Sequence, residues 1–159
     1  AFSRSHYAAH RPMSLSQVIH QSLAPYEPRA REANIAIELQ VPPDLPLCPS
    51  NDVWEVMGNV IKNALDAIGK DGRLRIAAEA EDRSVRIRVA DTGPGVPPDL
   101  QERIFEPFFT TKKEGAGTGL GLAVCRDALR RIGGDIRVAP SEVGATFEIT
   151  VPIRPNPTE

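Results

Sequence analysis

The sequence has little of what marks nucleic-acid-binding or membrane-spanning proteins. Its 159 residues carry 19 Lys and Arg against 21 Asp and Glu, for a formal net charge of -2, and so lack the basic excess that nucleic-acid binding normally requires. No apolar run approaches the ~18 residues that span a bilayer, and the first residues contain no apolar core of a signal peptide. We therefore expect a soluble, cytoplasmic chain that binds no nucleic acid and makes no direct membrane contact.

Cysteine is scarce as well. Cys48 and Cys125 are the only two cysteines, and they stand in no metal-like or CxxC spacing, which predicts buried reduced thiols rather than a disulfide framework. No internal repeat is present. With 41% hydrophobic residues, a chain of this length fits one globular domain with a sizeable core.

The pattern of apolar residues predicts helices and strands in mixed order. Helices are expected over 14–34, 55–68 and 120–132, with Ser14 or Ser16 capping the first, Pro25 and Pro28 breaking or kinking it, and a short helix near 98–103. Strands are expected over 35–41, 74–80, 84–90, 135–139 and 145–152. Because the strands form hairpins rather than regular βαβ units, we expect an α+β fold, a two-layer sandwich with helices on one face of a mixed sheet.

One predicted helix, EVMGNVIKNALDAI (55–68), carries a narrow polar stripe. At about 100° per residue, five side chains fall within one arc of roughly 100°: Glu55, Asn59, Lys62, Asn63 and Asp66. Asn is a mediocre helix former, so two Asn residues one turn apart stand against local propensity. Taken alone, the stripe is either a solvated face or a binding site.

Two glycine-rich segments are candidates for ligand binding. GAGTGLGL (115–122) leads directly into a predicted helix, where backbone amides suit a phosphate, although helix-start flexibility explains such a turn equally well. It is neither a P-loop nor a dinucleotide fingerprint. DTGPG places Asp91 at the end of a predicted strand, either as a turn former or as a carboxylate that needs a donor, such as the amino group of a base.

The order of these motifs, together with the run IFEPFFTTK between them, resembles the ATP-binding catalytic domain of sensor histidine kinases. These kinases belong to the Bergerat-fold superfamily, which also holds gyrase, MutL and the large heat-shock chaperones. The resemblance extends from about Pro12 to Pro152, and NALDAI is most similar to the nitrogen-regulator and C4-dicarboxylate sensor branch. It implies a mostly antiparallel sheet with helices on one face, a mobile ATP lid, and ATP and Mg²⁺ as cofactors.

The resemblance also implies roles for individual residues. Asn63 would supply an amide oxygen to Mg²⁺, which fits a hard cation that keeps several waters. Asp91 would accept a hydrogen bond from the adenine amino group, with Gly93 and Gly95 opening room for the base and Thr146 supporting its recognition. In IFEPFFTTK, the residues Phe105, Phe108 and Phe109 would anchor the lid or form plain core. Phosphate contacts would come from Lys112 and from the second glycine box, at Gly117, Thr118, Gly119, Leu120 and Gly121.

The polar stripe distinguishes transfer from hydrolysis. In the hydrolysing members of the superfamily a Glu stands one turn before the Mg²⁺-binding Asn, whereas this sequence has Asn59 there. A neutral amide cannot act as a general base, so we expect phosphoryl transfer by positioning and charge neutralisation. Asn59 and Glu55 are the predicted catalytic residues, Glu55 in a supporting role. Asn59 and Asp66 are also predicted to contact the cofactor. For Asp66 this contact would be a hydrogen bond in the adenine pocket, and the alternative is that it caps a neighbouring strand.

A phosphoacceptor histidine is missing from its usual context. The three His residues are His6, His10 and His20, and HQSLAPY lacks the acidic neighbour and the second long helix of a phosphoacceptor hairpin. We expect His20 to be a surface residue. Residues 1–11 are predicted to be the end of a dimerisation helix or a linker, 12–153 the ATP-binding domain and 154–159 a tail.

The expected function is transfer of the ATP γ-phosphate to a His on a separate dimerisation domain, followed by signalling to a response regulator. The fragment alone is expected not to autophosphorylate. Its location would be the cytoplasm, whether or not a parent sensor is membrane-bound. The alternatives are a nucleotide-binding interaction module without phosphotransfer, and an ATPase of the gyrase or MutL type, which Asn59 opposes.

Overall fold

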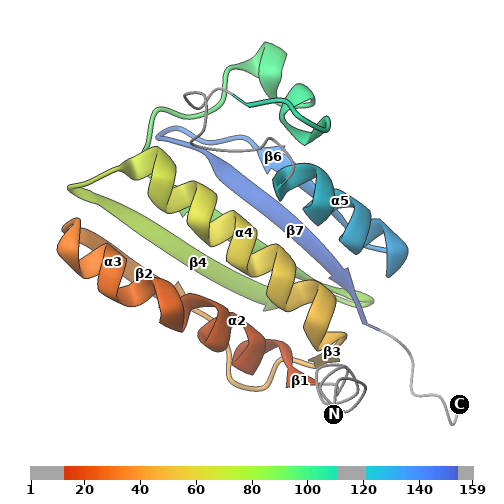
Figure 1. Ribbon diagram of the computed structural model, residues 1–159. Coiled ribbons are helices and arrows are strands. Elements are labelled where there is room, and N and C mark those ends of the chain that lie inside the picture. The colour runs from red at the N-terminus through yellow and green to blue at the C-terminus, as the bar shows by residue number, and fades with distance from the viewer. Residues whose placement is uncertain (1–12, 111–120, 154–159) are drawn as a thin grey trace, which may run out of the picture.

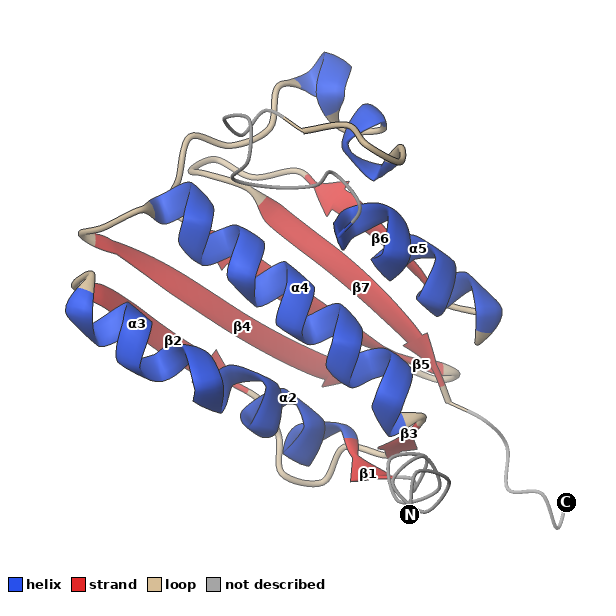
Figure 2. Ribbon diagram, viewed as in Figure 1, coloured by secondary structure: helices blue, strands red, loops and turns tan. Residues whose placement is uncertain are grey.

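The computed structural model describes residues 13–110 and 121–153. One layer is a five-stranded sheet, and the helices lie together on one of its faces (Figure 1; Figure 2). The strands are β2 (Ile35–Gln40), β4 (Gly72–Ala80), β5 (Ser84–Asp91), β6 (Asp135–Ala139) and β7 (Thr146–Pro152), in the spatial order β2-β4-β5-β7-β6. Within residues 13–110 and 121–153, the pair β2–β4 of this sheet is parallel and its other neighbouring pairs are antiparallel. The predicted two-layer α+β sandwich is therefore confirmed.

The first helical segment is broken where proline predicts a break. Helix α2 (Leu15–Leu23) begins after Ser14, whose side chain accepts a hydrogen bond from the Gln17 amide at 3.1 Å. A 3-10 turn, η1 (Ala24–Tyr26), contains Pro25, and α3 (Glu27–Glu32) follows. Proline lacks an amide hydrogen and clashes with the preceding turn, so the segment is divided into α2, a 3-10 turn and α3 instead of forming one long α-helix.

Helix α4 (Ser50–Ile68) is the central helix of the second layer. Its apolar side is fully buried, with Val56, Met57, Val60, Ile61 and Leu65 each at 0% exposure. It ends at Gly69, which has a φ of 73°, a conformation that glycine adopts without a Cβ penalty. The burial pattern agrees with the apolar face predicted for 55–68, although the helix begins earlier, at Ser50.

The remaining elements complete the layer and its connections. Helix α5 (Gly121–Arg131) packs against α4, and the short helix expected near 98–103 is instead two 3-10 turns, η2 (Pro98–Leu100) and η3 (Arg103–Phe105). Two short strands, β1 (Met13–Ser14) and β3 (Leu47–Cys48), form a separate antiparallel pair that the sequence did not predict. None of the helices in the described part of the chain has the length and apolar character to cross a membrane.

Both cysteines are buried and free, as predicted for structural thiols. Burial raises the pKa of the Cys48 thiol to about 11. Burial, with a smaller contribution from the Glu55 carboxylate, raises the pKa of the Cys125 thiol to about 12. Because the thiolate is the reactive form, both side chains are packing residues at neutral pH.

The sheet face opposite the helices carries an ion-pair cluster around Glu148 of β7. The Glu148 side chain is 7% exposed, and its carboxylate lies 3.0 Å from Arg137, 3.2 Å from Arg88 and 3.7 Å from Arg86. Burial opposes ionisation, but hydrogen bonds from Arg88 and Arg137 and the nearby arginine charges prevail and lower the pKa of the Glu148 carboxyl below 4.5. The ionised carboxylate therefore stabilises this face of the sheet.

We predict that Glu148→Gln lowers the free energy of unfolding at neutral pH by about 1–2 kcal/mol, the scale of hydrogen bonds to a charged group. A carboxyl with a lowered folded-state pKa stabilises the fold above 4.5, its value in the unfolded chain, and that contribution is lost as the pH falls through the folded-state value. Urea denaturation at a series of pH values should therefore show wild type and variant converging in acid. Glu81→Gln, at a 34% exposed partner of Arg86, is the control and should cost under about 0.5 kcal/mol. Equal losses in the two variants would contradict the assignment.

Candidate functional site

Asp91, the last residue of β5, is a buried carboxylate held by backbone amides. The residue is 3% exposed, and its Oδ1 accepts hydrogen bonds from the Gly93 amide at 2.8 Å and the Ala145 amide at 3.2 Å. Burial raises the pKa of the Asp91 carboxyl above 3.8, and the two amide hydrogen bonds oppose that shift. Since both donors reach Oδ1, the other carboxylate oxygen is the one that remains to accept from a ligand.

Glycines pack so closely around Asp91 that side chains would not fit. A Cβ on Gly93 would lie 2.8 Å from the Ala67 carbonyl oxygen near the end of α4. A Cβ on Gly95, which has a φ of 81°, would lie 2.9 Å from the Gly144 carbonyl oxygen. Gly144, at a φ of 64°, is tighter still, because its Cβ would lie 2.0 Å from the Asp91 carbonyl oxygen and 2.8 Å from Oδ1. The sequence indicated Gly93 and Gly95 but missed Gly144.

We predict that Gly144→Ala lowers the free energy of unfolding by about 3 kcal/mol or more, because it combines a backbone overlap with a left-handed φ. Gly58→Ala is the matched control. Gly58 lies within α4, and a Cβ there meets nothing within 4 Å, so this change should stabilise the helix by about 0.5–1 kcal/mol. Thermal unfolding of both variants gives the comparison. A Gly144→Ala variant as stable as wild type would show that the loop at Gly144 rearranges to accommodate the Cβ at little cost in free energy.

The Thr146 side chain and the Asp91 carboxylate lie on opposite faces of the sheet, and the support of adenine recognition by Thr146 stays a prediction. The strand register pairs Thr146 with Ala90 of β5 and Ala139 of β6. Because successive side chains point to opposite faces of a strand, Thr146 lies on the sheet face away from the helices, whereas Asp91 lies on the helical face. Ala145 is the residue of this turn that reaches the carboxylate, through its backbone amide. A backbone donor leaves no sequence signal beyond the small residues of GAT.

Asn59 lies where α4 meets the start of α5. Its Nδ2 donates to the Glu55 carbonyl oxygen at 3.2 Å, and a Cβ on Gly121, the first residue of α5, would lie 3.4 Å from Asn59 Oδ1. The structure thus brings together the polar stripe and the start of the helix that the second glycine box precedes. Glu55 is exposed one turn before Asn59, and Asn63 is half-buried one turn after it. Glu55, Asn59 and Asn63 therefore lie along the polar stripe of α4.

Asp66, the fifth residue of the stripe, forms ion pairs with two cations. Its Oδ1 accepts from Arg29 of α3, and its Oδ2 lies 3.5 Å from Lys62 one turn earlier. The side chain is 23% exposed. The pair with Arg29 joins α3 to α4, a contact between residues 37 positions apart that no sequence pattern predicted.

The three phenylalanines of IFEPFF have different surroundings. Phe105 is 6% exposed and meets Phe147 of β7 edge to face, with ring centroids 6.4 Å apart. Phe109 is half-buried, with the Arg103 guanidinium 5.0 Å from its ring centroid. Phe108 is 74% exposed at a φ of 68°. Phe105 therefore belongs to the core, one of the two alternatives given for these phenylalanines.

Part of the predicted site lies outside the described residues. This applies to the ATP lid and to the predicted phosphate contacts Lys112, Gly117, Thr118, Gly119 and Leu120, of which only the neighbouring Gly121 is described. His20 is exposed on α2, with its Nδ1 2.8 Å from the Ser16 carbonyl oxygen, as expected of a surface histidine.

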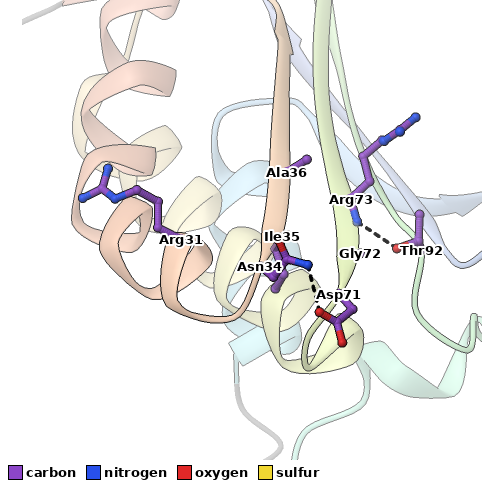
Figure 3. A pocket seen from close by; sticks show the side chains of 8 residues that line it. All are labelled: Arg31, Asn34, Ile35, Ala36, Asp71, Gly72, Arg73 and Thr92. Carbon is purple, nitrogen blue, oxygen red and sulfur yellow. Dashed lines mark hydrogen bonds between the residues drawn. The ribbon is translucent and has the colours of Figure 1, made fainter.

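A shallow hollow also lies beside β2 at the edge of the sheet (Figure 3). Asn34 and Asp71, both at a φ of 56°, are joined there by a side-chain hydrogen bond of 2.9 Å. The Thr92 hydroxyl accepts from the Arg73 amide. None of the eight lining residues is a predicted site residue. The close-packed carboxylate at Asp91 and the stripe on α4 carry more recognition chemistry than this open surface.

Comparison with known proteins agrees with this geometry. Residues 49–155 match the family described as histidine kinase-, DNA gyrase B-, and HSP90-like ATPase. The chain is 33% identical over 154 residues to DctB of Rhizobium meliloti, a C4-dicarboxylate transport sensor protein, covering 94% of this chain and 24% of DctB. It therefore spans about a quarter of that relative.

Solved structures give the same result. The nucleotide-free catalytic domain of histidine kinase ThkA superposes with a TM-score of 0.82 at 32% identity, covering 89% of this chain and 94% of that one. ThkA in complex with the response regulator TrrA superposes with a TM-score of 0.79 at 29% identity, covering 91% of this chain and 42% of that one. Full-length ShkA in complex with AMPPNP superposes with a TM-score of 0.75 at 34% identity, covering 88% of this chain and 30% of that one. The chain belongs to the family of histidine kinase-, DNA gyrase B- and HSP90-like ATPases, as a catalytic ATP-binding domain of the sensor histidine kinase type.

Proposed function

We propose that this domain binds ATP with Mg²⁺ and transfers the γ-phosphate to a histidine on a separate dimerisation domain of the same protein. The observation that carries the proposal is the arrangement at Asp91. One carboxylate oxygen is held by two backbone amides, which leaves the other to accept from the amino group of adenine. Glycine at 93 and 144 keeps the surrounding backbone close to this carboxylate.

The polar stripe of α4 supplies the other end of the proposed site. Among residues 13–110 and 121–153, no group of three or more His, Cys, Asp or Glu side chains could hold a metal ion. Mg²⁺ prefers oxygen ligands and usually keeps waters and phosphate oxygens, so one amide oxygen from Asn63 fits an ion that arrives with the nucleotide. Bound there, Mg²⁺ would neutralise charge on the triphosphate.

The residue at position 59 favours transfer over hydrolysis. Asn59 contacts the start of α5 and bonds the backbone of its own helix, and its neutral amide cannot take a proton from water. Glu55, the nearest acidic residue of the stripe, is one turn further back and exposed. We propose that the acceptor is a histidine brought by another domain, and that a response regulator then takes the phosphate, as the complex of ThkA with TrrA suggests.

The test is incubation with ATP labelled at the γ-phosphate, with and without the phosphoacceptor domain of the same protein supplied as a separate chain. We expect acid-labile label on that domain, none when its histidine is changed to Gln, and none on this domain alone. Binding of ATP without transfer would instead indicate an interaction module. Rapid release of free phosphate without an acceptor would indicate an ATPase, and label on His20 would contradict a separate acceptor.

A further inference from the structure

Arg126, near the middle of α5, contacts two other segments of the chain. Its Nη1 donates to Glu102 Oε2 at 3.2 Å and its Nη2 donates to the Ile136 carbonyl oxygen at 3.0 Å. Its Nε lies 3.4 Å from Asp135 Oδ1, and its guanidinium carbon lies 4.0 Å from the ring centroid of Phe105. With 14% of the side chain exposed, Arg126 is a half-buried junction between α5, the turn at η3 and strand β6.

These contacts lead to the carboxylate end of the site. Phe105, under the guanidinium, packs edge to face on Phe147 at an interplanar angle of 83°. Phe147 lies two residues after Ala145, whose amide donates to Asp91 Oδ1. A planar guanidinium stacked on a buried aromatic ring is a directional contact. Arg126 therefore links α5 to β6 directly and, through the rings of Phe105 and Phe147, to β7, the strand that follows Ala145.

The other end of α5 lies at the polar stripe. The helix begins at Gly121, next to Asn59, about 7.5 Å along the helix axis from Arg126 at 1.5 Å per residue. A shift of α5 as a unit against β7 would change the spacing between the Asn59 end and the Asp91 end. ATP must reach both ends at once.

We propose that Arg126 is a positioning residue that holds the start of α5 in register with Asp91, so that the adenine and phosphate parts of one nucleotide bind together. The inference rests on the nucleotide site proposed above. Arg130, one turn later, provides the contrast. It also lies 3.4 Å from Asp135 Oδ1, but its side chain is 58% exposed, as expected of an ordinary surface ion pair.

The experiment measures binding of Mg-ATP and of adenosine to Arg126→Met, Arg126→Lys and Arg130→Met by titration, at a temperature where each is folded. Adenosine reaches only the adenine end, whereas ATP spans both ends. We expect Arg126→Met to weaken ATP binding about tenfold, the scale of a lost positioning contact, and to change adenosine binding by less than about twofold, within the usual effect of a change outside the contact. Arg130→Met should leave both affinities unchanged.

A merely structural role would lower the melting temperature without changing the ratio of the two affinities. The inference is overturned if Arg126→Met binds ATP as wild type does, or if it weakens ATP and adenosine equally. Should Arg126→Met fail to fold, Arg126→Lys, which keeps the charge but not the planar stack, gives the same comparison with a smaller loss. Wild type that binds ATP but transfers no phosphate would count against the proposed function and leave this test intact.

Discussion

Asp91→Asn is expected to weaken ATP binding about 100-fold, the upper range for an unsatisfied buried polar group, while the domain stays folded. The two amides at Gly93 and Ala145 can still donate to an amide oxygen at the Oδ1 position. The amide nitrogen then occupies the other position and presents a donor to the adenine amino group, which is also a donor. One hydrogen bond is lost, and two donors face each other in a buried site.

Comparing ATP with inosine triphosphate makes the measurement specific. The inosine base has a carbonyl oxygen in place of the adenine amino group, so the Asp91→Asn variant should lose most of its preference for ATP. The control is Asp82→Asn, at an exposed acid in the turn between β4 and β5, which should bind both nucleotides as wild type does. An Asp91→Asn variant that keeps its full preference for ATP would show that another group reads the adenine.

The stability of the Asp91→Asn variant, in contrast to its ATP affinity, should not fall below that of wild type. Because burial raises the pKa of the Asp91 carboxyl, its ionised form lowers the stability of the fold at a pH above that raised value, and the penalty disappears as the carboxyl is protonated. An Asn side chain is neutral at every pH. The variant should therefore be at least as stable as wild type at neutral pH, as expected where a residue is retained for binding rather than for folding.

Asn63→Ala is expected to weaken Mg-ATP binding by about 10- to 100-fold, the range for losing a group that supports a metal site. Binding of ATP without Mg²⁺ should change much less, because the adenine end at Asp91 is untouched. The half-buried Asn63 lies on the stripe one turn from Asn59, and Ala is a strong helix former, so α4 should remain intact. Titrations with Mg²⁺ and with a chelator separate the two cases.

Asn51→Ala is the matched control for Asn63→Ala. It removes the same side chain from the first turn of α4, about 18 Å away along the helix axis at 1.5 Å per residue. We expect it to leave the Mg²⁺ dependence of ATP binding unchanged. An Asn63→Ala variant with unaltered affinity and Mg²⁺ dependence would return the stripe of α4 to an ordinary solvated face.

The sequence predicted the elements whose apolar residues repeat regularly. The alternation in 84–90 and 135–139 matches β5 and β6 almost residue for residue, and the 3.6-residue repeat predicted the buried face of α4. The pair β1 and β3 was missed because two-residue strands in a proline-rich stretch are too short to show any period. Elements long enough to show a repeat are therefore the ones that can be predicted from the sequence.

From the sequence one can name candidate site residues whose side chains carry chemistry, but not contacts made by backbone amides or set by strand register. Asp91 ends β5 and Asn59 lies on α4, the elements predicted to carry them, and their roles in nucleotide binding stay predictions. The sequence could not show on which face of the sheet Thr146 lies, because one step along a strand reverses the face, nor that the preceding Ala145 reaches Asp91 through its backbone amide. Arg126 gave no signal at all, since its partners lie in segments distant in sequence.

The most direct test is to map Mg-ATP on the isotope-labelled domain by amide chemical shifts. We expect ATP to shift the amides of four residues at the two ends of the proposed site: Gly93, Ala145, Asn59 and Asn63. The amides of Arg31, Asn34 and Ala36, which line the hollow beside β2, should stay in place. Shifts confined to that hollow, with Gly93 and Ala145 unmoved, would contradict the assignment of the nucleotide site to Asp91 and the stripe of α4.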